Sequence, residues 1–165
     1  MPRTIYVECK PDELLVKKLI GSRARVVHAG GKGGVVNRLC RDRARAIGLV
    51  DEDPGSAIPK RFRMEFELVE RHDEYGLAIY RRRSGHSYVV VLSPRLEEWI
   101  LEACKASRVD PQRYGLPRDP NEFHRVANIS LDSFEKLLIE LISVHSERLT
   151  LLRDTLLKLL EAADA

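Results

Sequence analysis

Residues 1–51 contain three short apolar runs rich in β-branched residues, and segments with helical character separate them. The runs cover residues 4–8, 25–29 and 46–51. Pro11 suits the first turn of the first intervening helix, and Gly21 suits its end. Strands that alternate with helices in this way are typical of a parallel sheet flanked by helices. The sequence therefore predicts an α/β fold with a mainly parallel sheet.

The rest of the chain gives weaker but usable signals for further elements. Short apolar runs indicate strands, proline and glycine indicate turns, and apolar residues every three or four positions indicate helices. From these signals we expect a glycine-rich turn at 30–34, a helix at 35–45, a loop at 56–63, strands at 64–69, 77–80 and 88–92, a helix at 94–106, a connector at 107–130 and one long helix at 131–162.

Composition limits the class of protein. The chain has 165 residues, of which 44% are hydrophobic and 32% charged, with a net charge of +3. Three widely spaced cysteines indicate a reducing compartment rather than a disulfide framework. No apolar run approaches the roughly 18–20 residues that span a membrane, and the N-terminus enters a strand directly. We expect a cytoplasmic protein without a membrane partner.

Acidic residues stand where two of the predicted strands end. Glu8 closes the first run, and Asp51, Glu52 and Asp53 close the third. In open α/β sheets, ligands bind at the carboxyl edge of the strands. Carboxylates that meet there repel one another unless a cation lies among them, and Mg²⁺ prefers oxygen ligands. The alternative is a solvated acidic turn, because Asp-Pro-Gly at 53–55 is a common turn sequence.

The order of these features resembles the Toprim family, which includes the catalytic domains of topoisomerases, primases and OLD-family nucleases. The family has a Glu at the end of its first strand and an Asp-x-Asp at the end of a later one, which Glu8, Asp51 and Asp53 match. The resemblance covers residues 4–55 well and 96–101 more weakly.

The resemblance implies a Toprim-like domain over residues 1–106, with the connector and C-terminal helical region of 107–165 packing on it. It also implies that Glu8, Asp51 and Asp53 are catalytic and bind Mg²⁺ or Mn²⁺. Asp12 and Glu97 are then further metal ligands, because several members carry acids at similar places. The implied function is a metal-dependent nuclease or phosphoryl-transfer protein that acts on nucleic acid.

Two departures from the family pattern keep other functions open. Cys9 follows the Glu where the family usually has Gly, and Gly55 comes two rather than three residues after the second Asp. These departures favour a non-catalytic, Toprim-like protein that binds nucleic acid or regulates a partner such as an ATPase. A third interpretation is an unrelated α/β domain that forms a homodimer through its C-terminal helix.

Basic residues near the predicted site indicate a polyanionic partner. Lys32 lies in the glycine-rich turn, and Lys60, Arg61 and Arg63 form a cluster. Such side chains contact nucleic-acid phosphates and release counterions. The alternatives are a flexible connector for the turn and a solvated, salt-bridged surface for the cluster, because few aromatic residues accompany the charges.

Overall fold

A computed structural model describes residues 3–41 and 45–162, and its strands form a single six-stranded sheet in the order β2-β1-β3-β6-β5-β4. The strands are β1 (Thr4–Val7), β2 (Arg25–His28), β3 (Ala46–Asp51), β4 (Phe66–His72), β5 (Leu77–Arg82) and β6 (Tyr88–Leu92). β2, β1, β3 and β6 pair in parallel, whereas β5 pairs antiparallel with both β6 and β4. The predicted α/β fold with a mainly parallel sheet is thus confirmed.

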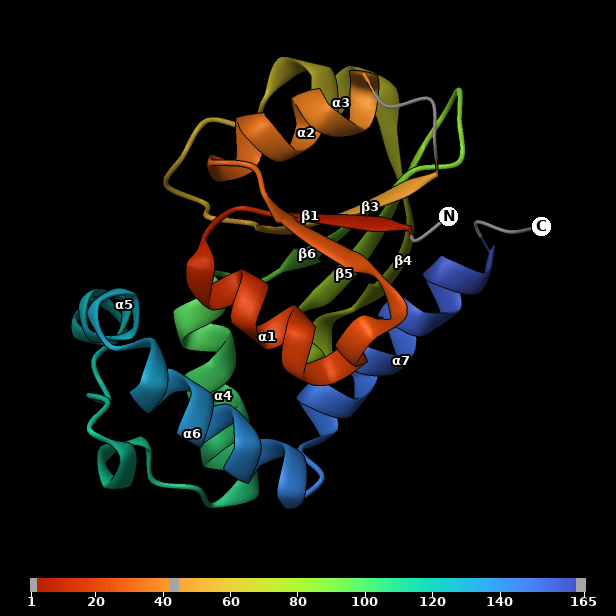
Figure 1. The fold of residues 1–165 in the computed structure, drawn as a ribbon. Helices are drawn as coiled ribbons and strands as arrows, with labels where there is room; N and C mark the ends of the chain where they lie inside the picture. Colours follow the sequence, from red (N-terminus) through yellow and green to blue (C-terminus); the bar gives the residue numbers. More distant parts are fainter. Residues whose placement is uncertain (1–2, 42–44, 163–165) are drawn as a thin grey trace.

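Helices cover both faces of the sheet. They are α1 (Lys10–Ile20), α2 (Gly31–Arg41), α3 (Lys60–Glu65), α4 (Leu96–Ser107), α5 (Pro120–Ile129), α6 (Leu131–Ser143) and α7 (Glu147–Ala162). Figure 1 shows α2 and α3 above the sheet and the other helices below it. Within the described ranges, no helix combines the length and the hydrophobicity needed to cross a membrane.

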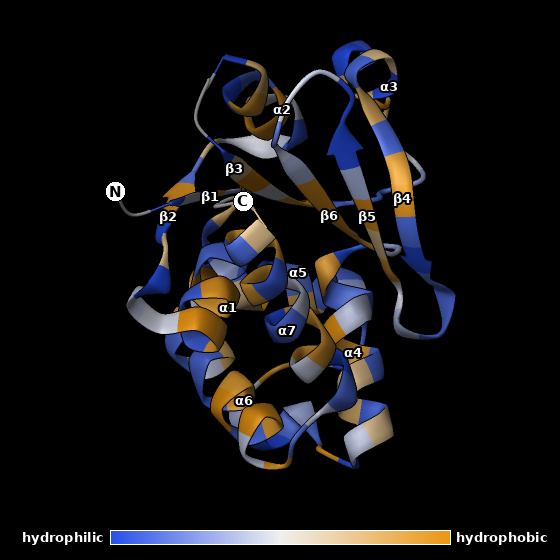
Figure 2. Ribbon diagram, turned by 90° about the vertical axis from the view of Figure 1, so that its right-hand side faces the viewer, coloured by the Kyte–Doolittle hydropathy of each residue, from blue (hydrophilic) through white to orange (hydrophobic). Residues whose placement is uncertain are grey.

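The two faces of the sheet bury separate apolar clusters, as the side-chain alternation of strands requires. Ile5 and Val7 of β1 point to the cluster shared with α1, α4 and α7, whereas Tyr6 points to the cluster shared with α2. Figure 2 shows these apolar strands lying between the two helical layers. The C-terminal helix contributes Leu152 and Leu156 to the lower cluster, so its apolar side packs within the chain.

Two predictions for the first half of the chain were wrong. The glycine-rich turn is mostly helix, because α2 already begins at Gly31, and its described part ends at Arg41. Residues 42–44 of the predicted helix at 35–45 lie outside the described residues. The predicted loop at 56–63 contains the start of α3 at Lys60. In α2 tertiary packing outweighs local preference, because Val35, Val36 and Leu39 are buried against the sheet.

In the C-terminal half, the secondary structure differs more from the prediction. The predicted connector at 107–130 contains α5, which Asp119 caps by accepting a hydrogen bond from the Glu122 N–H. The single long helix predicted at 131–162 is two helices. A turn at 144–146 separates them, and His145 has a left-handed backbone with φ of 56°. The apolar spacing continues across this turn, so periodicity alone did not reveal it.

Gly48 in the middle of β3 allows α2 to lie close to the sheet. A Cβ at this position would stand 2.6 Å from Val35 Cγ1 and 2.9 Å from Leu39 Cδ1. We expect Gly48→Ala to lower the free energy of unfolding by about 1–3 kcal/mol through overpacking, measured by urea denaturation. Gly55→Ala is the matched control, because no atom lies within 4 Å of a Cβ there. Equal stability of the two variants would contradict this packing.

Candidate active site

Four carboxylates, three within helices or strands and one just after a strand, meet at the carboxyl edge of the sheet. Glu8 directly follows β1, and Asp51 is the last residue of the neighbouring strand β3. Asp12 lies in the first turn of α1, and Glu97 lies in the first turn of α4. We call these four residues the carboxylate cluster. The C-terminal ends of parallel strands and the N-terminal ends of the helices that follow them lie at the same edge of the sheet. Residues far apart in sequence therefore become neighbours there.

Two hydrogen bonds join Glu8 and Asp51 to the backbone. The Asp51 N–H donates to Glu8 Oε2 over 2.7 Å, and the Leu96 N–H donates to Asp51 Oδ1 over 3.0 Å. Asp51 therefore caps α4 while its own backbone holds Glu8. Each of these two carboxylates keeps a second oxygen outside these bonds.

The other two members of the cluster are buried. Asp12 is 2% exposed and Glu97 is 5% exposed. The Cys9 thiol donates to Asp12 Oδ2 over 2.9 Å, and His124 Nδ1 lies 2.6 Å from Glu97 Oε1. Among the described residues, Asp12 Oδ1 is a buried oxygen without a hydrogen-bond partner. Such an atom is costly unless a proton or a cation satisfies it.

Burial and like charge raise the pKa of three members of the cluster. Burial, followed by Asp12, Glu8 and Glu97, raises the pKa of Asp51 from 3.8 to about 9. Burial also raises the pKa of Asp12 to about 7, against hydrogen bonds from Cys9, and Glu8 and Glu97 add to the rise. The pKa of Glu8 is raised by burial, although the Asp51 N–H and Lys32 oppose this. The cluster therefore favours bound positive charge.

Asp53 has a different environment from Asp51. It lies beyond the end of β3 with a left-handed φ of 44°, and its N–H donates to the Pro94 carbonyl over 2.7 Å. Its charge adds to the rise in the pKa of Glu8, so it approaches the cluster. It is nevertheless half-exposed and outside the buried group.

The donor chemistry of the cluster suits a hard cation. All four members offer carboxylate oxygens, and burial raises the pKa of the Cys9 thiol, which stays protonated and is a poor ligand. Within residues 3–41 and 45–162, no three His, Cys, Asp or Glu side chains are arranged as a ready metal-binding group. Mg²⁺ does not need one, because it commonly takes one or two carboxylates together with waters and substrate phosphates.

The predicted basic residues lie on the face covered by α2 and α3. The Lys32 ammonium donates to the Glu52 carbonyl over 2.7 Å, beside the cluster. The Gly31 N–H donates to the Glu8 carbonyl over 3.1 Å, so the start of α2 lies against the end of β1. Lys60, Arg61 and Arg63 are exposed on α3, and Arg61 pairs with Glu65 at 3.0 Å.

Sequence reasoning missed the pairing of His124 with Glu97. His124 lies on α5, inside the segment predicted as a connector. The signal that was available is Asp119 followed by Pro120 and Glu122, which is typical of a helix start.

Comparisons with protein-family models, with curated proteins and with solved structures found no match for this chain. The fold and the cluster define an α/β protein whose acidic residues gather where such sheets bind ligands.

Proposed function

We propose that this protein is a metal-dependent nuclease, or a related phosphoryl-transfer protein, that acts on nucleic acid. The observation that carries the proposal is the carboxylate cluster, in which burial and like charge raise the pKa values of Asp12 and Asp51. In the described part of the chain, Asp12 Oδ1 also has no hydrogen-bond partner. The Toprim resemblance of Glu8, Asp51 and Asp53 is part of the same proposal.

The residues have distinct roles in this proposal. Glu8 and Asp51 would hold Mg²⁺ or Mn²⁺ with their remaining oxygens, and Asp53 would be a further ligand. When bound, the cation neutralises the phosphate and lowers the pKa of a water molecule. Alternatively, Glu8 would use its remaining oxygen as a general acid or base and leave the cation to the aspartates, since burial raises its pKa above the usual carboxyl range. Asp12 and Glu97, the buried members of the cluster, add negative charge to the site.

Cations on the neighbouring helices position the nucleic acid. Lys32 lies beside the cluster, and Lys60, Arg61 and Arg63 present positive charge on α3. Such contacts neutralise backbone phosphates and make binding depend on salt concentration.

A second candidate function is binding of nucleic acid without catalysis. Two observations favour it. Glu8 and Asp51 each use one oxygen on a backbone N–H, and the described residues contain no ready group of three metal ligands.

Glu8→Gln tests the metal-dependent function. We expect the wild type to cleave at least one of single- and double-stranded DNA and RNA with Mg²⁺ or Mn²⁺, and to lose cleavage in EDTA. Glu8→Gln should cut the rate by about 10²-fold or more, because the amide neither binds the cation well nor transfers the proton. Mg²⁺ should also raise the melting temperature of the wild type more than that of the variant.

Glu13→Gln is the matched control, because Glu13 also lies in the first turn of α1 but pairs with Lys17. It should cleave like the wild type. Cleavage that survives Glu8→Gln would point to another site. Metal-independent binding of nucleic acid without cleavage would favour the second candidate.

A further inference from the structure

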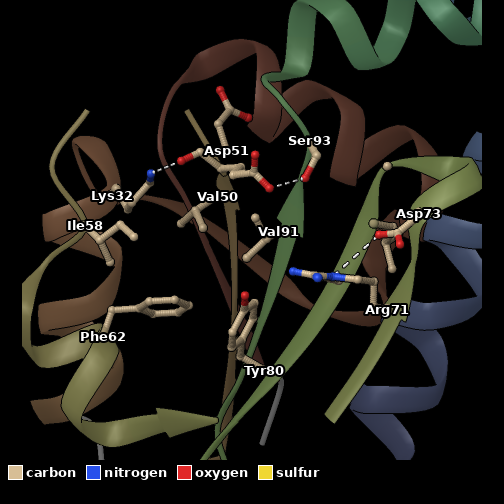
Figure 3. Close-up of a pocket in the computed structure, with 14 residues that line it drawn as sticks. Lys32, Val50, Asp51, Ile58, Phe62, Arg71, Asp73, Tyr80, Val91 and Ser93 are labelled. Carbon is tan, nitrogen blue, oxygen red and sulfur yellow. Dashed lines mark hydrogen bonds and ion pairs between the residues drawn. The ribbon is translucent and has the colours of Figure 1, made fainter. Parts of the chain in front are cut away.

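A cavity of about 300 Å³ opens on the upper face of the sheet beside the carboxylate cluster. Val50 of β3 and Val91 of β6 form its floor, and Asp51 and Glu52 line the side that faces the cluster. Figure 3 shows this arrangement, with the floor between the end of β3 and the side chain of Tyr80. Its volume lies at the lower end of the range for small-ligand sites, which is about 300–1,000 Å³.

One wall of the cavity is aromatic. Phe62 of α3 and Tyr80 of β5 have ring centroids 4.9 Å apart and planes tilted by 59°. Figure 3 shows both rings at the cavity, with the Tyr80 hydroxyl directed toward Val91 and Asp51. Ile58, in the preceding loop, adds an apolar side chain that is 50% exposed. Such walls bind flat rings, and stacking of a base on an aromatic side chain contributes about 1–3 kcal/mol.

The rim of the same cavity is polar and carries two cations. Lys32 enters from α2, and its ammonium bonds to the Glu52 carbonyl over 2.7 Å. Arg71 reaches in from β4 and forms a loose ion pair with Asp73 at 3.6 Å. Ser93 donates to Glu52 Oε2 over 2.8 Å, so hydrogen-bonding groups also face the space.

The aromatic wall and the polar, cationic rim together restrict the chemical class of ligand that the cavity can bind. A purely apolar molecule would offer no anion to Lys32, which bonds to a neutral carbonyl, or to Arg71, which pairs loosely with Asp73. A free inorganic anion would leave the aromatic wall unused. A heteroaromatic base joined to a phosphate satisfies both the wall and the rim, because its ring stacks and its phosphate meets the cations. The side of the cavity toward Asp51 leads to the carboxylate cluster, where the proposed cation would contact that phosphate.

We propose that this cavity binds the base of a nucleotide and places its phosphate between Lys32 and the carboxylate cluster. The inference deepens the proposed function and rests on it for the role of the phosphate, whereas the stacking of the base rests on the cavity alone. The nucleotide belongs either to a nucleic-acid chain or to a free monophosphate.

The test measures binding of the four ribonucleoside 5′-monophosphates and their deoxy forms by calorimetry in EDTA. Saturation-transfer NMR identifies the ligand protons that contact the protein. We expect at least one monophosphate to bind about tenfold or more tightly than inorganic phosphate, with transfer to the base protons. Ile58→Asp should weaken binding about tenfold, because it puts a charge beside the stacked ring. Lys32→Ala should weaken the monophosphate more than the matching nucleoside.

Ile129→Asp is the matched control, since Ile129 is 74% exposed on α5 and does not line the cavity. It should bind like the wild type. Absence of saturable binding for every monophosphate, equal binding of inorganic phosphate, or full binding by Ile58→Asp would each overturn the inference.

Cleavage assays on the same variants separate this inference from the proposed function. Base binding in EDTA without any metal-dependent cleavage upholds the cavity and overturns the nuclease. Cleavage that depends on Glu8, with no nucleotide binding and no effect of Ile58→Asp, overturns the cavity and upholds the nuclease. If Ile58→Asp weakens the binding of both monophosphates and oligonucleotides, the cavity binds a nucleotide within a nucleic-acid strand. If it weakens the binding of monophosphates alone, the cavity binds a free nucleotide.

Discussion

Asp51→Asn is expected to make the metal-free protein more stable at pH 8, by on the order of 2–4 kcal/mol in the free energy of unfolding. Burial, with Asp12, Glu8 and Glu97, raises the pKa of Asp51 from 3.8 to about 9. Between these two values the folded protein binds more protons than the unfolded chain, so its stability falls as pH rises. Asparagine removes this penalty, and its side-chain oxygen still accepts from the Leu96 N–H.

Urea denaturation in EDTA at pH 4.5 and pH 8 measures this effect. The gain should shrink toward pH 4, because the carboxyl group is then increasingly protonated in both states. Asp53→Asn is the matched control, since Asp53 is half-exposed and asparagine tolerates its positive φ. A variant less stable than the wild type at pH 8 would show that the charge of Asp51 is not a burden on the fold.

The same substitution is expected to have the largest effect on activity. Under the proposed function, Asp51→Asn should lower the cleavage rate by on the order of 10³-fold, which corresponds to several kcal/mol of lost cation binding in the transition state. Asp53→Asn should lower it by only about tenfold, because Asp53 lies outside the buried cluster and reaches it from the solvent side.

Rates measured over a range of Mg²⁺ concentrations distinguish a loss of metal affinity from a loss of chemistry. If Asp53→Asn proved the more damaging change, the half-exposed acid would be the main ligand. Greater stability together with lower activity for Asp51→Asn would identify the cluster as a site where fold stability is lower because the chemistry requires buried charge.

The sequence was sufficient for the part of the fold that carries the cluster. Glu8, Asp12 and Asp51 could be placed because short β-branched runs and a proline-led helix fix where strands end and helices begin. Glu97 was proposed only from the weaker Toprim resemblance of residues 96–101. Local patterns are informative here because the apolar spacing of each element agrees with its type, and the residues at its ends are typical start and stop signals.

The other features depend on tertiary packing, which local sequence patterns do not indicate. The glycines of α2 are poor helix formers, yet buried Val35 and Leu39 hold them in a helix. The turn at His145 interrupts an apolar spacing that continues on both sides of it. The cavity draws on residues from Lys32 to Ser93 in α2, β3, α3, β4, β5 and β6 and in the loops between them, so no single segment of the sequence indicates it.

The way in which Asp51 is held has a consequence for how such chains diverge. Its oxygen caps α4 and its N–H fixes Glu8, and neither bond requires a negative charge on its own side chain. Exchange of the carboxylate for an amide therefore keeps the architecture while it removes the charge. Loss of the side chain, as in alanine, would instead leave the Leu96 N–H without this acceptor. A catalytic protein with this fold and a related protein that only binds its ligand can thus differ by a single Asp-to-Asn substitution and keep the same backbone structure.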